Sequence, residues 1–298
     1  MCDDITELEN QGFYEKTVTR REFNLLAGGA AISVAFAGCA PGEKMETKSG
    51  DSITESDVMI ETPDGMADAY FAHPSQGAHA AVLIWPDIVS LRPAFKMMAK
   101  RLAGDGYAAL VVNPYYRKAK APFVEPGQGF RDPAIRELVV PYRRSLTEAT
   151  TRSDARTFID WLDAQPAVDT SKGVGTTGYC MGGPMTMLTA HERNDRVRAG
   201  ASFHGGGLNT DKPDSPHLLI PEMNADYLIA IAENDDERNP ESKNILRAAF
   251  DATDNAAEIE VYAGTKHGWC PPDSAVYDEA MANKAWARTL ALFEKSLA

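Results

Sequence analysis

A short strand, a tight turn and the start of a helix follow one another in Val174-Gly175-Thr176-Thr177-Gly178-Tyr179-Cys180-Met181-Gly182-Gly183. The run before Cys180 has the length and composition of a buried strand, and residues 181–191 are typical of a helix. Glycines two positions before and two positions after Cys180 allow the strand and the helix to approach closely. This is the Gly-x-Ser-x-Gly arrangement of a nucleophile, with Cys in place of Ser. The alternative is a small core cysteine beside a glycine-rich turn.

Strand-like runs alternate with longer amphipathic runs on both sides of this turn. The alternation predicts a single α/β domain, with a mostly parallel sheet covered by helices on both faces. In such sheets the ligand crevice lies at the carboxyl ends of the strands. Segments 120–136 and 205–223, rich in Pro and Gly, are expected to be irregular. The predicted strands are 58–62, 69–72, 80–85, 107–112, 174–179, 199–203, 227–231 and 259–262, and the predicted helices are 93–106, 147–164, 181–191, 240–254 and 278–297.

The composition excludes several classes of protein. With 298 residues, 44% hydrophobic and 24% charged, the chain is typical of a globular protein and not of a disordered, collagen-like or multi-span membrane protein. A net charge of −13 repels phosphate backbones, so nucleic acid is not an expected partner. Four scattered cysteines make no disulfide scaffold, and neither they nor the histidines have metal-ligand spacing, so no metal site is expected.

Residues 1–39 have the pattern of an export signal. Between Phe23 and Gly42 there is no Asp, Glu, Lys or Arg, and the apolar run is short for a membrane span. It follows Thr19-Arg20-Arg21-Glu22-Phe23, which resembles a twin-arginine export signal. An uncleaved N-terminal anchor is the alternative. We therefore expect an exported protein, periplasmic or lipid-anchored to a membrane facing the periplasm, with a cytoplasmic location as the other possibility.

The apolar run ends at Cys39. Small residues before a cysteine resemble the lipobox of bacterial lipoproteins, in which the cysteine is lipidated, although Phe36 stands where Leu is usual. The alternative is a cysteine at the end of a cleaved or buried apolar helix. Residues 40–54 are polar and predict a tether, followed by the domain at 55–298. Contact with a membrane is expected only through the signal or a lipid anchor.

An acid and a base follow two later strands of the predicted sheet. The strand 227–231 ends in a run that contains Asp235 and Asp236, and the strand 259–262 is followed by His267. Nucleophile, acid and base in this chain order are those of the α/β-hydrolases. His267 would act as the base for Cys180, oriented by an aspartate, while the Met181 amide at the helix start could donate to an oxyanion. Asp235 is preferred because it comes first after the strand, and Asp236 is the alternative triad acid.

On these residues the sequence resembles the dienelactone hydrolase family of α/β-hydrolases. Gly-x-Cys-x-Gly-Gly, the strand-end aspartate and the His-Gly-aromatic turn all match in order, over about residues 55–298. The resemblance implies an α/β-hydrolase fold and a carboxymethylenebutenolidase-like hydrolysis of small esters or lactones. It implies a cysteine triad that works without metal or organic cofactor, and a small-molecule ester or lactone as the partner. The sequence gives no prediction of the oligomeric state.

The resemblance implies roles for three further residues. Asp87 stands where the family has a Glu beside the resting thiol, so it would influence thiol activation, and the Ile88 amide would be the second oxyanion donor beside Met181. A turn-capping Asp is the alternative for Asp87. Arg117 matches an arginine that holds a substrate carboxylate, with a solvated basic loop as the alternative. Pro271 stands where the family has its second carboxylate-binding arginine, which argues against dienelactone itself as substrate.

Two other features are interpreted as secondary. His204 begins a His-Gly-Gly-Gly run that resembles a lipase oxyanion loop, but it follows the wrong strand and is interpreted as a glycine-rich turn. Cys270 is expected to be a free thiol, with a Cys180 to Cys270 disulfide as the alternative. The alternative function is an exported non-hydrolytic thiol protein, either a ligand-binding lipoprotein or a redox sensor. A peptidase with the same triad is a third possibility.

Overall fold

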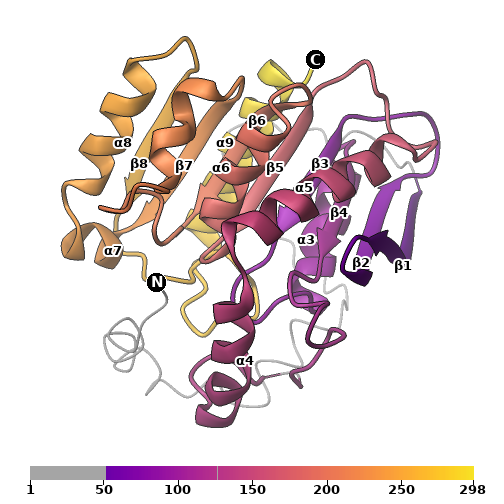
Figure 1. Cartoon of the computed structure of the whole chain (residues 1–298), viewed down its shortest axis with the longest axis horizontal. Helices are drawn as coiled ribbons and strands as arrows, with labels where there is room; N and C mark the ends of the chain where they lie inside the picture. Colours follow the sequence, from indigo (N-terminus) through magenta and orange to yellow (C-terminus); the bar gives the residue numbers. More distant parts are fainter. Residues whose placement is uncertain (1–51, 126) are drawn as a thin grey trace, which may run out of the picture.

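The computed structural model describes residues 52–125 and 127–298. Its sheet has eight strands in the order β1-β2-β4-β3-β5-β6-β7-β8 (Figure 1). The pairs β1 with β2 and β2 with β4 are antiparallel, and the remaining pairs are parallel. This mostly parallel sheet confirms the predicted α/β fold class. The strands are β1 (Ile53–Thr62), β2 (Gly65–Pro74), β3 (Ala81–Trp85), β4 (Ala108–Val112), β5 (Val174–Tyr179), β6 (Val197–Phe203), β7 (Asp226–Ala232) and β8 (Ala257–Tyr262).

The central strands are buried on both faces. Every residue of β3, β4 and β5 is buried, and the sequences of β3 and β4 are continuously apolar, as expected for strands covered on both faces. By contrast β1, at one end of the sheet, is largely exposed. Cys180 therefore follows a buried central strand, whereas His267 follows β8, which forms the edge of the sheet opposite β1.

Helices cover both faces of the sheet. One buried cluster includes Phe95 of α3 and Phe293 of α9, and the other includes Phe158 of α5, Met187 of α6 and Phe250 of α8. In Figure 1, α5, α6 and α8 lie in front of the sheet and α9 behind it. The helices are α3 (Pro93–Gly104), α4 (Pro133–Ser145), α5 (Glu148–Asp163), α6 (Gly182–Glu192), α7 (Glu233–Arg238), α8 (Ser242–Asp251) and α9 (Glu279–Ser296), with a 3-10 helix η1 (Pro216–Glu222).

Several elements differ from the sequence-based expectation. The 3-10 helix η1 lies in the segment 205–223 that was expected to be irregular, α4 begins inside the segment 120–136, and neither α4 nor α7 was predicted. The helix α4 has proper start signals, because Pro133 occupies its first turn and the Asp132 side chain accepts a hydrogen bond from the Ala134 amide. Pro141 lies inside α4 and interrupts the helical pattern of the sequence, so no helix was predicted there.

The N-terminal predictions concern a part of the chain that is mostly not described. The export signal, the lipobox at Cys39 and the greater part of the tether fall on residues 1–51, outside the described residues. The first described strand, β1, begins at Ile53 and pairs with β2 there. In the ranges 52–125 and 127–298, no helix combines the length and the apolar character needed to cross a bilayer.

Candidate active site

The turn after β5 holds Cys180 in a strained backbone conformation. Its φ of 54° lies in the left-handed region, which non-glycine residues rarely adopt. The flanking glycines are required by close approach, because a Cβ on Gly178 would lie 2.1 Å from the Gly182 carbonyl oxygen. A Cβ on Gly182 would lie 2.3 Å from the Trp85 carbonyl oxygen at the end of β3. Strand, turn and helix therefore occur here as the sequence predicted.

The side chain of Cys180 is nearly buried, with 4% of the residue exposed. Cys270 is a free thiol, so no disulfide joins Cys180 to Cys270. The expectation of a free Cys270 is thus confirmed, and its burial raises the thiol pKa well above the ordinary value. Any nucleophilic chemistry at Cys180 requires the reduced thiol.

His267 lies in the loop after β8 and is held by two neighbouring side chains of α7. Its Nδ1 lies 2.7 Å from Oδ2 of Asp235, and its backbone amide donates to Oδ1 of Asn234 at 2.8 Å. Asp236 points elsewhere, because both of its carboxylate oxygens accept from Lys243 at 2.5 and 2.7 Å. Of the two candidate acids, Asp235 is therefore the one that contacts His267, and a carboxylate at Nδ1 leaves Nε2 as the nitrogen that can accept a proton.

The turns that carry Ile88 and Met181 are joined by one buried tyrosine. The hydroxyl of Tyr115 lies 3.1 Å from the carbonyl oxygen of Ile88 and 3.0 Å from Sδ of Met181. Burial raises the pKa of Tyr115, so its hydroxyl remains a neutral donor. The sequence analysis missed this residue, although its place just after β4 is a signal that could have found it.

Asp87 is engaged by an arginine that the sequence analysis did not single out. Arg92 donates to its two oxygens at 2.7 and 2.9 Å, and to the two oxygens of Asp273 at 2.6 and 2.9 Å. Only 8% of the Arg92 side chain is exposed. Because Asp273 lies on the loop after His267, this ion cluster joins that loop to the turn after β3. A role of Asp87 in thiol activation remains a prediction.

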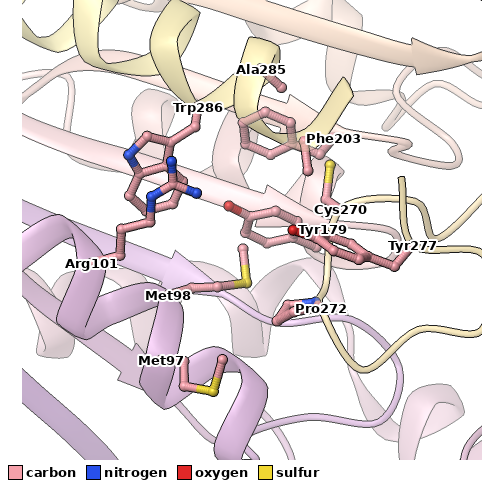
Figure 2. A pocket seen from close by; sticks show the side chains of 11 residues that line it. Met97, Met98, Arg101, Tyr179, Phe203, Cys270, Pro272, Tyr277, Ala285 and Trp286 are labelled. Atoms are coloured by element: carbon pink, nitrogen blue, oxygen red, sulfur yellow. The ribbon is translucent and has the colours of Figure 1, made fainter. Parts of the chain in front are cut away.

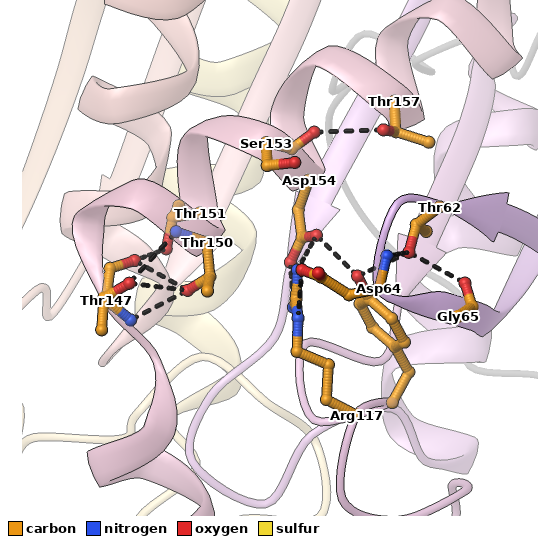
Figure 3. Close-up of polar contacts among 11 residues, drawn as sticks. Thr62, Asp64, Gly65, Arg117, Thr147, Thr150, Thr151, Ser153, Asp154 and Thr157 are labelled. Atoms are coloured by element: carbon orange, nitrogen blue, oxygen red, sulfur yellow. Dashed lines mark hydrogen bonds and ion pairs between the residues drawn. The ribbon is translucent and has the colours of Figure 1, made fainter.

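Arg117 lies in a second ion cluster, shown in Figure 3. Its Nε and Nη2 donate to Asp64 at 2.8 and 2.7 Å, and its Nη1 and Nη2 donate to Asp154 at 2.8 and 2.7 Å. The Asp154 side chain is only 2% exposed, and its burial raises its pKa. Every nitrogen of this guanidinium thus faces a carboxylate. Binding of a substrate carboxylate by Arg117 would require these contacts to break.

His204 was interpreted as part of a glycine-rich turn, but the structure places it against His267. The two ring centroids are 5.1 Å apart and the planes are inclined at 65°. His204 has a φ of 40°, and the only other non-glycine residues of positive φ among the described residues are Ser90 and Cys180. The three follow β3, β5 and β6, which are neighbours in the sheet. Backbone strain of this kind clusters at functional sites.

A small pocket of about 150 Å³ lies on the α3 and α9 side of this strand edge (Figure 2). Its inner wall is formed by Tyr179 and Phe203, the residues that directly precede Cys180 and His204, and Cys270 lies beside them. Tyr179 and Phe203 stack with centroids 4.8 Å apart. The pocket therefore lies next to the backbone that carries Cys180 and His204. Among the described residues, no group of three or more His, Cys, Asp or Glu side chains is suited to hold a metal ion.

Comparison with known proteins gives a consistent result. A model of the dienelactone hydrolase family matches residues 67–297. A relative from Salmonella typhi, named "Putative carboxymethylenebutenolidase", is 26% identical over 255 residues, which cover 79% of this chain and 90% of the relative.

Solved structures show the same fold. A dienelactone hydrolase-like promiscuous phosphotriesterase from metagenomic libraries has a TM-score of 0.68 and 21% identity, over 83% of this chain and 99% of that one. A dienelactone hydrolase from Anabaena variabilis has a TM-score of 0.60 and 17% identity, over 83% of this chain and 99% of that one. At these identities the structural likeness supports the fold alone.

Proposed function

The chain belongs to the dienelactone hydrolase family, and we propose that it cleaves small carboxylic esters or lactones with Cys180 as nucleophile, His267 as general base and Asp235 as the residue that orients His267. The observation that carries this proposal is the 2.7 Å contact of His267 Nδ1 with Asp235, at the strand edge that also bears the Cys180 turn. A carboxylate at Nδ1 stabilises the imidazolium that forms when Nε2 takes a proton.

The reaction proceeds in two halves. The reduced Cys180 sulfur attacks the carbonyl carbon while His267 takes the thiol proton, and the amides of Ile88 and Met181 stabilise the oxyanion. The carbon to oxygen bond of the ester then breaks, and the leaving alkoxide receives the proton from His267. In the second half, His267 takes a proton from water and the hydroxide attacks the thioester; the carbon to sulfur bond then breaks, the carboxylic acid leaves, and the Cys180 thiolate regains the proton from His267.

The arginine contacts limit the substrate class. Arg117 is bound by two aspartates, and position 271 is a proline. No cation is therefore supplied at the two positions at which the family resemblance implied carboxylate recognition. We propose substrates recognised mainly through their ester or lactone group and apolar parts, and not through a free carboxylate.

The test is stopped-flow hydrolysis of p-nitrophenyl acetate by the chain under reducing conditions. We expect a burst of p-nitrophenolate followed by steady turnover in the wild type, and neither in Cys180→Ala or His267→Ala. Asp235→Asn should lower kcat by about a thousandfold or more, as loss of a triad aspartate does elsewhere. Asp236→Asn is the matched control and should keep wild-type kcat.

Two results would contradict the proposal. Unchanged turnover in Cys180→Ala would rule out the cysteine mechanism. One reaction per chain, without turnover, would favour the non-hydrolytic thiol protein.

We also propose export, supported by the Arg20-Arg21 motif, and modification at Cys39. Mass spectrometry of the protein from membrane and periplasmic fractions tests both, and an intact Met1 end would contradict a cleaved export signal.

A further inference from the structure

The backbone holds His204 at the end of β6 in an unusual conformation. Its amide donates to the carbonyl oxygen of Ala230 on β7 at 2.8 Å, while its φ is 40°. Asn, Asp and His adopt this region more readily than bulky residues do. The strand therefore ends in a turn that directs this one side chain to the inside, where 1% of the residue is exposed.

The ring of His204 packs against three aromatic rings of the described residues. Its centroid lies 5.1 Å from that of His267, 6.2 Å from Tyr179 and 6.3 Å from Trp269. Neither ring nitrogen of His204 has a hydrogen-bond partner among the described residues. A buried polar group without a partner costs free energy, and so does a left-handed φ. The fold thus contains a side chain that its own packing does not favour, directly against the proposed general base.

The His204 ring is neutral at ordinary pH. Burial lowers its pKa well below the usual value, and the neighbouring His267 lowers the pKa further. Among the described residues, Asp235 contacts the His267 ring and Tyr179, whose pKa is raised by burial, contacts the His204 ring. A neutral His204 does not repel the imidazolium that His267 becomes during the reaction, and without hydrogen bonds it does not compete with Asp235 for the His267 ring.

We propose that His204 is a positioning residue for His267: its ring packs against the His267 imidazole and keeps it aligned between Asp235 and Cys180. This inference rests on the proposed hydrolytic function. It assigns no proton transfer and no substrate contact to His204. It predicts that activity depends on the presence of an aromatic ring at position 204, while folding stability depends on how well the residue tolerates the left-handed backbone.

Two variants separate the effect of the ring at position 204 from the effect of its left-handed backbone. His204→Asn keeps a residue that tolerates this φ but removes the ring, and His204→Phe keeps a ring on a backbone that tolerates the φ less well. We expect His204→Asn to lose about 10-fold to 100-fold in kcat for p-nitrophenyl acetate, with KM nearly unchanged, since small misplacements of a catalytic group cost this much. His204→Phe should retain most of the kcat. Thermal unfolding of both variants checks that they are folded.

A second measurement does not depend on hydrolysis. Ring signals of ¹³C,¹⁵N-histidine-labelled protein, with His267 assigned from His267→Gln, report whether the His267 ring keeps one fixed orientation. In His204→Asn these signals should shift and broaden because the His267 ring loses its neighbour, whereas in His204→Phe they should match the wild type. Unchanged His267 ring signals in His204→Asn, or a higher kcat in His204→Asn than in His204→Phe, would overturn the inference. If neither the wild type nor any variant hydrolyses the ester, the proposed function fails, while the ring signals still test the contact.

Discussion

The buried Arg92 and the half-buried Arg117 each bridge a pair of aspartates, yet they join different parts of the molecule. Arg92 binds Asp87 on the turn after β3 and Asp273 on the loop after His267. Arg117 binds Asp64 between β1 and β2, and Asp154 in α5. The first cluster ties together two loops of the candidate site, whereas the second ties a hairpin to a helix of the scaffold. The same bidentate chemistry therefore joins two loops of the candidate site in one place and a hairpin to a helix in the other.

The comparison also shows how to interpret an arginine near a candidate site. Arg117 was a candidate substrate ligand because it lies in a loop beside the strand ends, but all of its guanidinium nitrogens donate to carboxylates. What an arginine already binds decides whether it can bind a substrate. Three perturbations of the two clusters test this distinction.

The largest effect is expected for Arg92→Met. Removal of the guanidinium leaves the largely buried Asp87 without its counter-ion, which we expect to lower the free energy of unfolding by about 3–5 kcal/mol. It also frees the loop that follows His267, so kcat should fall as well. Urea unfolding and ester hydrolysis of the same preparations measure the two effects. A folded variant with wild-type kcat would show that the Arg92 cluster has no part in arranging the site.

Arg117→Met should lower stability by a similar order, about 3 kcal/mol, because Asp154 is buried, but should leave KM and kcat unchanged in the folded enzyme. Steady-state kinetics with neutral and carboxylate-bearing esters provides the measurement. A large rise in KM confined to the carboxylate-bearing ester would remove the distinction between the clusters and restore Arg117 as a substrate ligand.

The stability loss of Arg117→Met should depend on pH. Burial already raises the pKa of Asp154, and the contacts with Arg117 oppose that rise, so the variant has a higher folded-state pKa than the wild type. A carboxyl whose pKa is higher in the folded than in the unfolded state binds its proton on folding, so the variant regains stability relative to wild type as pH falls through this pKa. The difference in urea midpoint should therefore be smaller at about pH 5 than at about pH 7.5. An equal difference at both values would contradict a charged, buried Asp154.

The smallest effect is expected for Asp273→Asn. Its side chain is 39% exposed, and the amide keeps the shape of the carboxylate, so we expect a loss of about 1 kcal/mol or less. Arg92 still has Asp87 as a counter-ion. Thermal unfolding at low and high salt measures this loss, and a penalty as large as that of Arg92→Met would show that Asp273, and not Asp87, dominates the cluster.

Local patterns predicted the parts of the molecule that are locally determined. The strand before Cys180 and the glycines around it are specified by neighbours in the chain, and the structure places them as predicted. The partners of Arg117 could not be predicted, because Asp64 and Asp154 lie 53 and 37 residues away in sequence. The contact of His204 with His267 could not be predicted for the same reason, since the glycines after His204 predict only a turn. Ring contacts between strand ends depend on strand order, which the sequence does not state.

The left-handed turns at Ser90, Cys180 and His204 also limit how this protein can drift during evolution. Few residue types fit such a backbone, so these three positions should tolerate few substitutions, whereas insertions can accumulate in the loops beyond them. New substrate preferences would then arise by exchange of loops over an unchanged strand edge. In a saturation library selected only for folding, we expect these three positions, which follow neighbouring strands, to accept few residue types, and the surrounding loop positions to accept many.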